Sequence, residues 1–130
     1  MYLLIDVGNT RVKWRLVNNK YNAGEASHYG SLEDLADFMS TLDADETQVL
    51  LAAVNQTAEL KQLLSVNNFK KVTIASSKLY EAGLRNSYAS PERMGVDRWL
   101  AMIAAYTYVD EEVRHKGIIV VDAGSALTID

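Results

Sequence analysis

Two short segments, one near each end of the chain, carry residue types that can bind phosphate and metal ions. Residues 5–10 are Ile-Asp-Val-Gly-Asn-Thr and residues 121–126 are Val-Asp-Ala-Gly-Ser-Ala, so each places Asp-x-Gly after an apolar run. Glycine lets the backbone approach a ligand closely, neighbouring N–H groups can donate to phosphate, and aspartate can hold a cation or its water. One such segment alone is more often a plain turn. Two in the same context favour a pair of phosphate-binding hairpins.

A third segment, residues 88–99, combines a carboxylate with a guanidinium. Gly95 stands where an irregular stretch gives way to a helical pattern, and Asp97 and Arg98 fall in the first turn of that helix. A carboxylate there can orient a hydroxyl group and accept its proton, while a guanidinium can hold a carboxylate or phosphate with two parallel hydrogen bonds. The simpler interpretation is an ordinary helix start, with Asp97 favouring the helix dipole and Arg98 solvated. Lys13, taken alone, is similarly only a charge on a strand surface.

The first of these segments must be positioned by a β-hairpin. Residues 2–7 form an apolar run, and residues 11–17 alternate between apolar and charged side chains, which predicts a half-buried strand. Gly8 and Asn9 suit the turn between the two strands. Residues 21–29 predict a weaker third strand.

Helical and strand patterns alternate along the rest of the chain. Ser31, followed three residues later by Asp34, predicts a helix start. The patterns predict helices over residues 32–42, around 60–64 and over 96–109, and strands over 49–54, 72–75 and 118–121. Residues 76–93 are irregular. This order predicts an α/β fold with a mixed sheet, and without a Rossmann or Walker glycine pattern any nucleotide site must use another device.

The composition excludes several classes of protein. Thirteen basic and seventeen acidic residues give a net charge of −4, which argues against a nucleic-acid partner. The absence of cysteine excludes a disulfide scaffold, a zinc finger and a thiol nucleophile. No apolar run approaches the roughly 20 residues of a membrane span, and the first six residues lack the basic leader of a signal peptide. We therefore expect a cytoplasmic domain with no membrane partner.

Three motifs together resemble the type III pantothenate kinase family. They are residues 6–10, residues 88–99 with Tyr88, Pro91 and a Met-Gly-x-Asp-Arg-Trp end, and residues 122–130 with the pattern Asp-Ala-Gly-Ser-Ala-x-Thr-x-Asp. Their order and spacing match over the whole chain. The resemblance implies an actin-like, ribonuclease H-like ATPase fold. It also implies phosphorylation of pantothenate by ATP, the first step of coenzyme A biosynthesis.

The resemblance also implies a role for individual residues. ATP would be bound by Asp6, Val7, Gly8, Asn9, Thr10, Arg11, Val12, Lys13 and Ser125. Pantothenate would be bound by Tyr88, Gly95, Val96, Asp97 and Arg98, with Asp97 as the catalytic proton acceptor. Asp6 would lie near a divalent metal and Asp122 would hold a monovalent cation. Ser125 stands where the family usually has threonine and keeps the hydroxyl group, and Met94 stands where leucine is common.

The implied cofactors are Mg²⁺ with ATP and a monovalent cation, K⁺ or NH₄⁺. The implied partners are ATP, pantothenate and a second copy of the chain, because the family is expected to be a homodimer whose substrate site is completed across the interface. The implied fold is duplicated, with residues 1–116 as the first actin-like domain and residues 117–130 opening a second one. We therefore expect this chain to be an amino-terminal part of a longer protein, inactive when isolated, with an apolar edge over residues 118–121.

Two other classes of function remain open at this point. One is a non-catalytic relative that binds nucleotide or acts as a regulatory accessory protein, since the family overlaps in sequence with Bvg accessory factors. The other is a different actin-like enzyme, such as a sugar kinase or a phosphatase. The segment from Gly95 to Arg98 favours the kinase, because a protein that only binds nucleotide would not need it.

Overall fold

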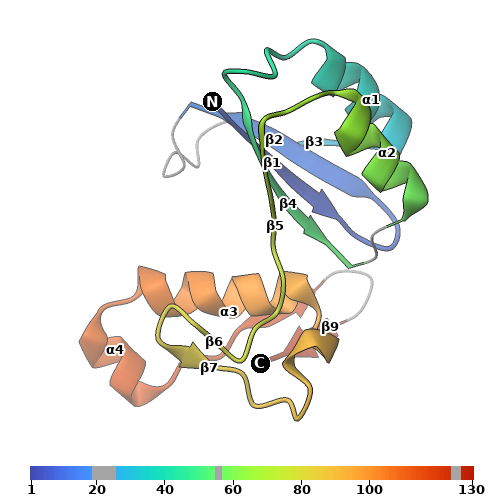
Figure 1. The fold of residues 1–130 in the computed structure, drawn as a ribbon. Helices are drawn as coiled ribbons and strands as arrows, with labels where there is room; N and C mark the ends of the chain where they lie inside the picture. Colours follow the sequence, from blue (N-terminus) through green and yellow to red (C-terminus); the bar gives the residue numbers. More distant parts are fainter. Residues whose placement is uncertain (19–25, 55–56, 124–126) are drawn as a thin grey trace. The chain divides into compact units, whose positions relative to one another are not determined.

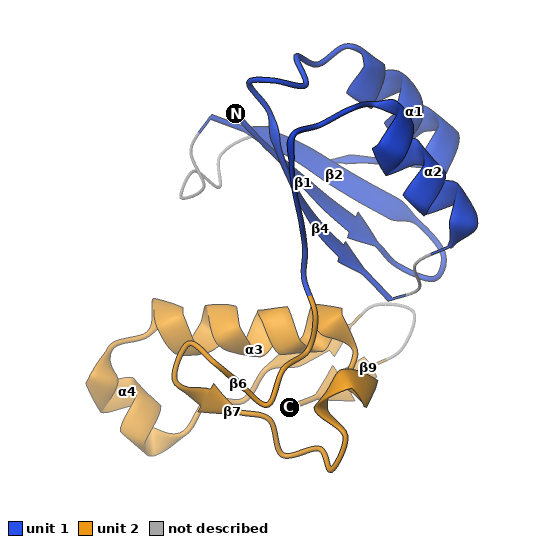
Figure 2. Cartoon of the chain, in the orientation of Figure 1, with its two compact units in different colours: residues 1–75 blue, residues 76–130 orange. Residues whose placement is uncertain are grey.

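The computed structural model describes residues 1–18, 26–54, 57–123 and 127–130. The chain forms two compact units, residues 1–75 and residues 76–130, shown in two colours in Figure 2. The second unit groups the helices of residues 96–116 with the last described strands, and the predicted domain boundary after residue 116 stays a prediction. The assignment of residues 117–130 to a second actin-like domain stays a prediction.

The first unit begins with the predicted hairpin. Strand β1 (Tyr2–Val7) pairs antiparallel with β2 (Val12–Val17), and their register places Asp6 opposite Lys13. The backbone N–H of Gly8 donates to the carbonyl of Arg11 at 3.1 Å, which closes the turn. The sequence-based prediction of this hairpin is confirmed.

The hairpin is part of a five-stranded sheet with the order β3-β2-β1-β4-β5. The added strands are β3 (His28–Gly30), β4 (Gln48–Ala53) and β5 (Lys71–Ile74). β4 runs parallel to both β1 and β5, whereas β2 and β3 are antiparallel to their neighbours, so the sheet is mixed as predicted. The third strand was expected over residues 21–29; its described part is β3, and residues 21–25 lie outside the described residues.

Two helices, α1 (Leu32–Ser40) and α2 (Ala58–Val66), cover one face of this sheet (Figure 1). The Ser31 side chain accepts the Asp34 N–H while the Asp34 carboxylate accepts the Ser31 N–H, so the predicted helix start is a complete capping box. The buried core between helices and sheet consists of Leu3, Ile5, Val12, Trp14, Leu35, Met39, Val49, Leu51, Leu60 and Phe69. The buried alternate residues of β1, β2 and β4 therefore anchor the hairpin to the core on the sheet face that α1 and α2 cover.

The second unit contains a longer helix, α3 (Val96–Tyr108), which agrees with the prediction over residues 96–109. Before it, the stretch predicted to be irregular contains the short hairpin β6 (Tyr80–Glu81) and β7 (Leu84–Arg85) and a 3-10 helix, η1 (Pro91–Arg93). The hairpin turn needs positive φ at both central residues, and Ala82 has φ 50° beside Gly83 at 89°. The sequence gives no signal for such a turn, because alanine rarely adopts that conformation.

The second unit ends with a short helix and a second hairpin. Helix α4 (Glu111–Lys116) was missed from the sequence because its residues show no apolar periodicity; Asp110 caps it by accepting the Val113 N–H. β8 (Val121–Ala123) pairs antiparallel with β9 (Leu127–Ile129), so the strand predicted over residues 118–121 begins three residues later than expected.

Apolar side chains are exposed along this second hairpin and just before it. Ile119, Val121, Leu127 and Ile129 are each between 60% and 76% exposed. The apolar edge expected over residues 118–121 stays a prediction. No helix within the described residues is long and apolar enough to cross a membrane.

Candidate active site

The first turn of α3 holds Asp97, the carboxylate that the sequence predicts to be catalytic. Gly95 is the N-cap of the helix, and the exposed Asp97 turns its carboxylate back so that Oδ1 accepts the Arg98 backbone N–H at 2.9 Å. A Cβ built on Gly95 would lie 2.6 Å from the same Oδ1 atom. The absence of a side chain at Gly95 therefore makes room for the Asp97 carboxylate in an exposed position.

Arg98 lies beside Asp97, and its guanidinium is held on two sides. Its Nε donates to Asp130 Oδ2 at 2.9 Å and its Nη2 donates to Asp130 Oδ1, which makes a two-point ion pair. Its Nη1 donates to the Tyr88 hydroxyl at 3.2 Å. These hydrogen bonds raise the pKa of Arg98 above its ordinary value, and the hydrogen bonds from Arg98 lower the pKa of Asp130. Two predicted pantothenate residues, Tyr88 and Arg98, are thus in direct contact.

A buried asparagine holds the loop that carries Tyr88. Asn86 Oδ1 accepts the Tyr88 backbone N–H at 3.0 Å, and Asn86 Nδ2 lies 3.4 Å from both the Pro91 carbonyl and Met94 Sδ. The Asn86 N–H also donates to the Leu79 carbonyl at 2.9 Å, so the asparagine side chain and backbone join both ends of the loop. This network leaves little freedom for the Tyr88 backbone.

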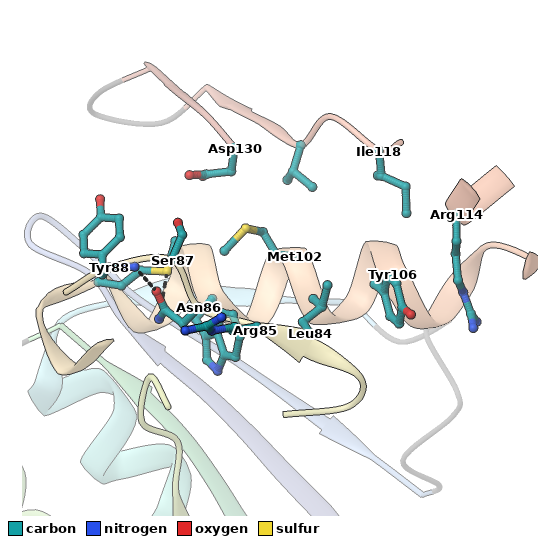
Figure 3. A pocket seen from close by; sticks show the side chains of 13 residues that line it. Leu84, Arg85, Asn86, Ser87, Tyr88, Met102, Tyr106, Arg114, Ile118 and Asp130 are labelled. Atoms are coloured by element: carbon teal, nitrogen blue, oxygen red, sulfur yellow. Dashed lines mark hydrogen bonds between the residues drawn. The ribbon is translucent and has the colours of Figure 1, made fainter. Parts of the chain in front are cut away.

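A cavity of about 380 Å³ opens beside this cluster. Figure 3 shows Tyr88, Ser87 and Asp130 toward one end of it and Tyr106, Arg114 and Ile118 toward the other. The Arg114 guanidinium lies over the Tyr106 ring, 4.7 Å from its centroid. The cavity lining consists of Leu84, Arg85, Asn86, Ser87, Tyr88, Met94, Trp99, Met102, Tyr106, Arg114, Ile118, Val120 and Asp130. The Tyr88 and Asp130 side chains thus lie toward the same end of the cavity.

The other predicted pantothenate residue in this segment, Val96, is buried. Met94 and Trp99, close to Val96 along the chain, are buried as well. Any contact of Val96 with a ligand would therefore have to come from its backbone. The sequence placed Val96 in the site because it lies inside the motif, but its burial distinguishes it from the exposed Asp97 that follows it.

The predicted ATP-binding segment, residues 6–13, lies in the first unit. Its tip, residues 8–11, is exposed, whereas the Val12 side chain is buried in the core beneath the sheet. Lys13 Nζ lies 3.9 Å from Asp6 Oδ2 across the two strands, and both side chains are about half exposed. The hairpin therefore presents a carboxylate and an ammonium group side by side next to an exposed glycine turn.

The second Asp-x-Gly segment is described only in part. Asp122 is exposed on β8, opposite Thr128 of β9. Ser125, predicted to contact ATP, lies outside the described residues together with its two neighbours, residues 124 and 126.

Asp6 and Asp122 are the carboxylates predicted to lie near a divalent metal ion and to hold a monovalent cation, respectively. Within the part of the chain that the structure describes, no three His, Cys, Asp or Glu side chains are grouped as a metal site. Asp6 and Asp122 each offer one carboxylate. Mg²⁺ in nucleotide sites commonly binds one or two carboxylates together with water and phosphate oxygens, so Asp6 suits an ion that arrives with ATP.

Two residues of this cluster received no role from the sequence. Asp130 was the last residue of the third motif and received no role there, and Asn86 belonged to no motif. The sequence indicates only that Asp130 directly follows the short run Leu127-Thr128-Ile129, which forms strand β9. Nothing in the sequence indicated that it would pair with a residue 32 positions earlier.

The chain is similar in sequence to known proteins along its whole length. The family model described as type III pantothenate kinase matches residues 2–130. Proteins named type III pantothenate kinase from Methylobacillus flagellatus, Cellvibrio japonicus and Marinobacter nauticus are 37%, 38% and 38% identical to this chain over 128, 138 and 137 residues. These alignments cover 98–100% of this chain but 48–52% of each relative. The chain thus spans about half the length of the curated relatives it matches.

Proposed function

The chain belongs to the type III pantothenate kinase family, and from this premise we propose that the full-length gene product transfers the γ-phosphoryl group of ATP to the primary hydroxyl of pantothenate. The observation that carries the proposal is the cluster at the start of α3, where an exposed carboxylate, a fixed guanidinium and a tyrosine hydroxyl lie together. That combination suits recognition of a small polar alcohol. It gives no reason to prefer a protein that only binds nucleotide.

Asp97 acts on the hydroxyl that attacks phosphorus. Its carboxylate accepts the hydrogen bond from the substrate hydroxyl, aligns the oxygen with the γ-phosphorus, and accepts the proton as the new O–P bond forms and the bond to the ADP oxygen breaks. Carboxylates are weak bases, so orientation is the larger part of this contribution. The exposed position of Asp97 and the space left by Gly95 support this role.

Tyr88 and Arg98 bind the rest of pantothenate. Tyr88 lines the cavity beside α3, and Arg98 donates a hydrogen bond to the Tyr88 hydroxyl from next to it. The hydrophobic part of the lining suits the two methyl groups of the substrate. Gly95 and Val96 contribute backbone at the same turn. The substrate hydroxyl would then lie beside Asp97.

The hairpin of residues 6–13 binds the phosphates of ATP, with the backbone of the Gly8 turn and the Lys13 ammonium as donors. Mg²⁺ bound with ATP, near Asp6, supplies neutralisation of the phosphate charge. Asp122 holds a monovalent cation, K⁺ or NH₄⁺, and Ser125 contacts the nucleotide. The exposed tip of the first hairpin and the exposed Asp122 support these assignments.

The full-length protein is proposed to be a cytoplasmic homodimer with a duplicated actin-like fold, in which residues 117–130 open the second domain. Two observations support the duplication. Asp6 and Asp122 each lie on the first strand of an antiparallel hairpin, and the apolar side chains of the second hairpin are exposed. The isolated 130 residues are expected to be inactive.

The test is an assay of ADP release by the full-length gene product with ATP and Mg²⁺, with and without pantothenate, and with K⁺, NH₄⁺ or Na⁺. We expect release that requires pantothenate and is stimulated by K⁺ or NH₄⁺, with phosphopantothenate identified by mass spectrometry. Asp97→Asn should lower kcat by on the order of 100-fold or more.

Glu92→Gln is the matched control, since Glu92 is an exposed carboxylate five residues away on η1. It should change kcat by less than about twofold. No pantothenate-dependent release from the wild-type protein would refute the kinase. Full activity of Asp97→Asn would refute only the role of Asp97.

A further inference from the structure

We propose that Asp130 is a positioning residue for pantothenate, which acts by holding Arg98 and, through Arg98, the Tyr88 hydroxyl. This inference rests on the proposed kinase function. It adds a residue that directly follows strand β9 to a site that the sequence confined to residues 88–98.

The first argument is the geometry of the ion pair. Asp130 receives both Nε and Nη2 of Arg98, the two-point arrangement in which a guanidinium loses most of its freedom to rotate. The Asp130 side chain is only 7% exposed, so water competes weakly for its oxygens. Its backbone is also anchored, because Asp130 and Val120 exchange two hydrogen bonds, at 2.9 and 3.0 Å. The carboxylate is therefore a fixed point for Arg98.

The second argument is the number of donors left for a ligand. A guanidinium has five N–H donors. Three of the Arg98 donors are used within the described residues, two by Asp130 and one by Tyr88. The edge formed by Nε and Nη2 is occupied by Asp130, so a ligand can meet Arg98 only at its outer edge. Asp130 thus determines which side of Arg98 faces the substrate.

The third argument concerns Tyr88. Its hydroxyl oxygen accepts a hydrogen bond from Arg98 Nη1, which leaves the hydroxyl hydrogen to be donated elsewhere. Asn86 fixes the Tyr88 backbone, and Arg98 fixes the far end of its side chain. The chain of contacts from Asp130 through Arg98 to Tyr88 therefore presents an oriented donor at the end of the cavity that Tyr88 lines.

The test is steady-state kinetics of the full-length gene product with Asp130→Asn, which keeps the shape of the side chain and removes its charge. One of the two Arg98 donors then faces an amide NH₂ group, so Arg98 and Tyr88 lose their fixed orientation. We expect the KM for pantothenate to rise by on the order of 10- to 100-fold, while the KM for ATP stays within about twofold. Asp130→Glu, which restores the carboxylate, should fall between Asp130→Asn and the wild type.

A double-mutant cycle tests whether Asp130 acts through Arg98. In an Arg98→Met background, Asp130→Asn should raise the KM for pantothenate by less than about twofold further, because the residue that it positions is already gone. Glu112→Gln is the control: Glu112 pairs with Lys116 at 2.7 Å in the same unit, and its loss should leave both KM values unchanged. Melting temperatures of all variants identify any that fail to fold. If Asp130→Asn fails to fold, Asp130→Glu carries the test, with a rise in the KM for pantothenate alone as the expected result.

Several results would overturn the inference while leaving the kinase intact: an unchanged KM for pantothenate in a folded Asp130 variant, an equal rise in both KM values, or a full effect of Asp130→Asn in the Arg98→Met background. A wild-type protein with no pantothenate-dependent turnover would overturn the proposed function, and this inference with it. The two failures are therefore distinguished by the wild-type measurement.

Discussion

The Asp97 carboxylate occupies the space next to Gly95 that any other residue would fill with its Cβ: the position of that Cβ lies 2.6 Å from Asp97 Oδ1. Real Cβ atoms do not approach an oxygen so closely, so a side chain at position 95 must displace the carboxylate. The backbone of Gly95 has φ −54° and ψ 129°, which every residue can adopt. The glycine is thus explained by the space it leaves for Asp97 and not by backbone conformation.

Gly95→Ala should therefore impair catalysis while leaving the fold intact. The methyl group moves the Asp97 carboxylate away from the substrate hydroxyl, and we expect kcat to fall by on the order of 10- to 100-fold. The melting temperature should change little, because alanine fits the backbone. The measurement is pantothenate-dependent ADP release beside a thermal melt. In an Asp97→Asn background the same change should cost little more, and two fully additive losses would contradict the explanation.

Lys13→Gln should separate nucleotide binding from stability. The Lys13–Asp6 pair spans 3.9 Å between side chains that are about half exposed, so its loss should alter the free energy of unfolding by less than about 0.5 kcal/mol. The KM for ATP should nevertheless rise about tenfold, since a charge facing phosphate is removed. Lys70→Gln, which breaks the exposed pair with Asp45, is the control and should change neither value. An unchanged KM for ATP in Lys13→Gln would remove Lys13 from the nucleotide site.

Ser31→Ala should destabilise the first unit through helix α1. The Ser31 hydroxyl accepts the Asp34 N–H at 3.1 Å, and the substitution leaves that N–H without its cap. We expect a loss of about 1 kcal/mol in urea unfolding and faster amide exchange in the first turn of α1. Ser40→Ala, at the other end of the helix, should cost less, because Ser40 only donates to the Asp37 carbonyl. Equal effects of the two substitutions would argue against a stabilising capping box.

The Arg98–Asp130 pair should make stability depend on pH in the acid range. The hydrogen bonds from Arg98 hold the pKa of Asp130 below its ordinary value of 3.8. A carboxyl whose pKa is lower in the folded state stabilises fully above its unfolded pKa and loses that contribution as pH falls through the folded pKa. Asp130→Asn should thus cost about 2 kcal/mol at neutral pH and progressively less below about pH 4. Urea unfolding at a series of pH values measures this difference. Asp45→Asn, which removes a carboxylate from an exposed pair, is the control and should cost less than about 0.5 kcal/mol at neutral pH.

Local pattern was sufficient for several of the regular elements of this chain, including β1, β2 and the start of α1. Alternation predicted β2, the apolar run predicted β1, and Ser31 with Asp34 predicted the start of α1 because a cap is made by residues three positions apart. The same reasoning failed for β6, β7 and α4. The turn at Ala82 has a conformation that its residue type disfavours, and α4 has no apolar face to show a period.

For the candidate site too, some features follow from local sequence and others only from the tertiary structure. The sequence by itself determined which residue types are present and which of them are neighbours along the chain, so Gly95, Asp97 and Arg98 could be placed at a helix start. Only the tertiary structure decided that Arg98 meets Asp130, that Asn86 fixes the Tyr88 loop and that Val96 is buried. The physical reason is that an ion pair or a buried contact depends on distance in space. The path of the backbone between residues 98 and 130 sets that distance, and no local pattern of residues records it.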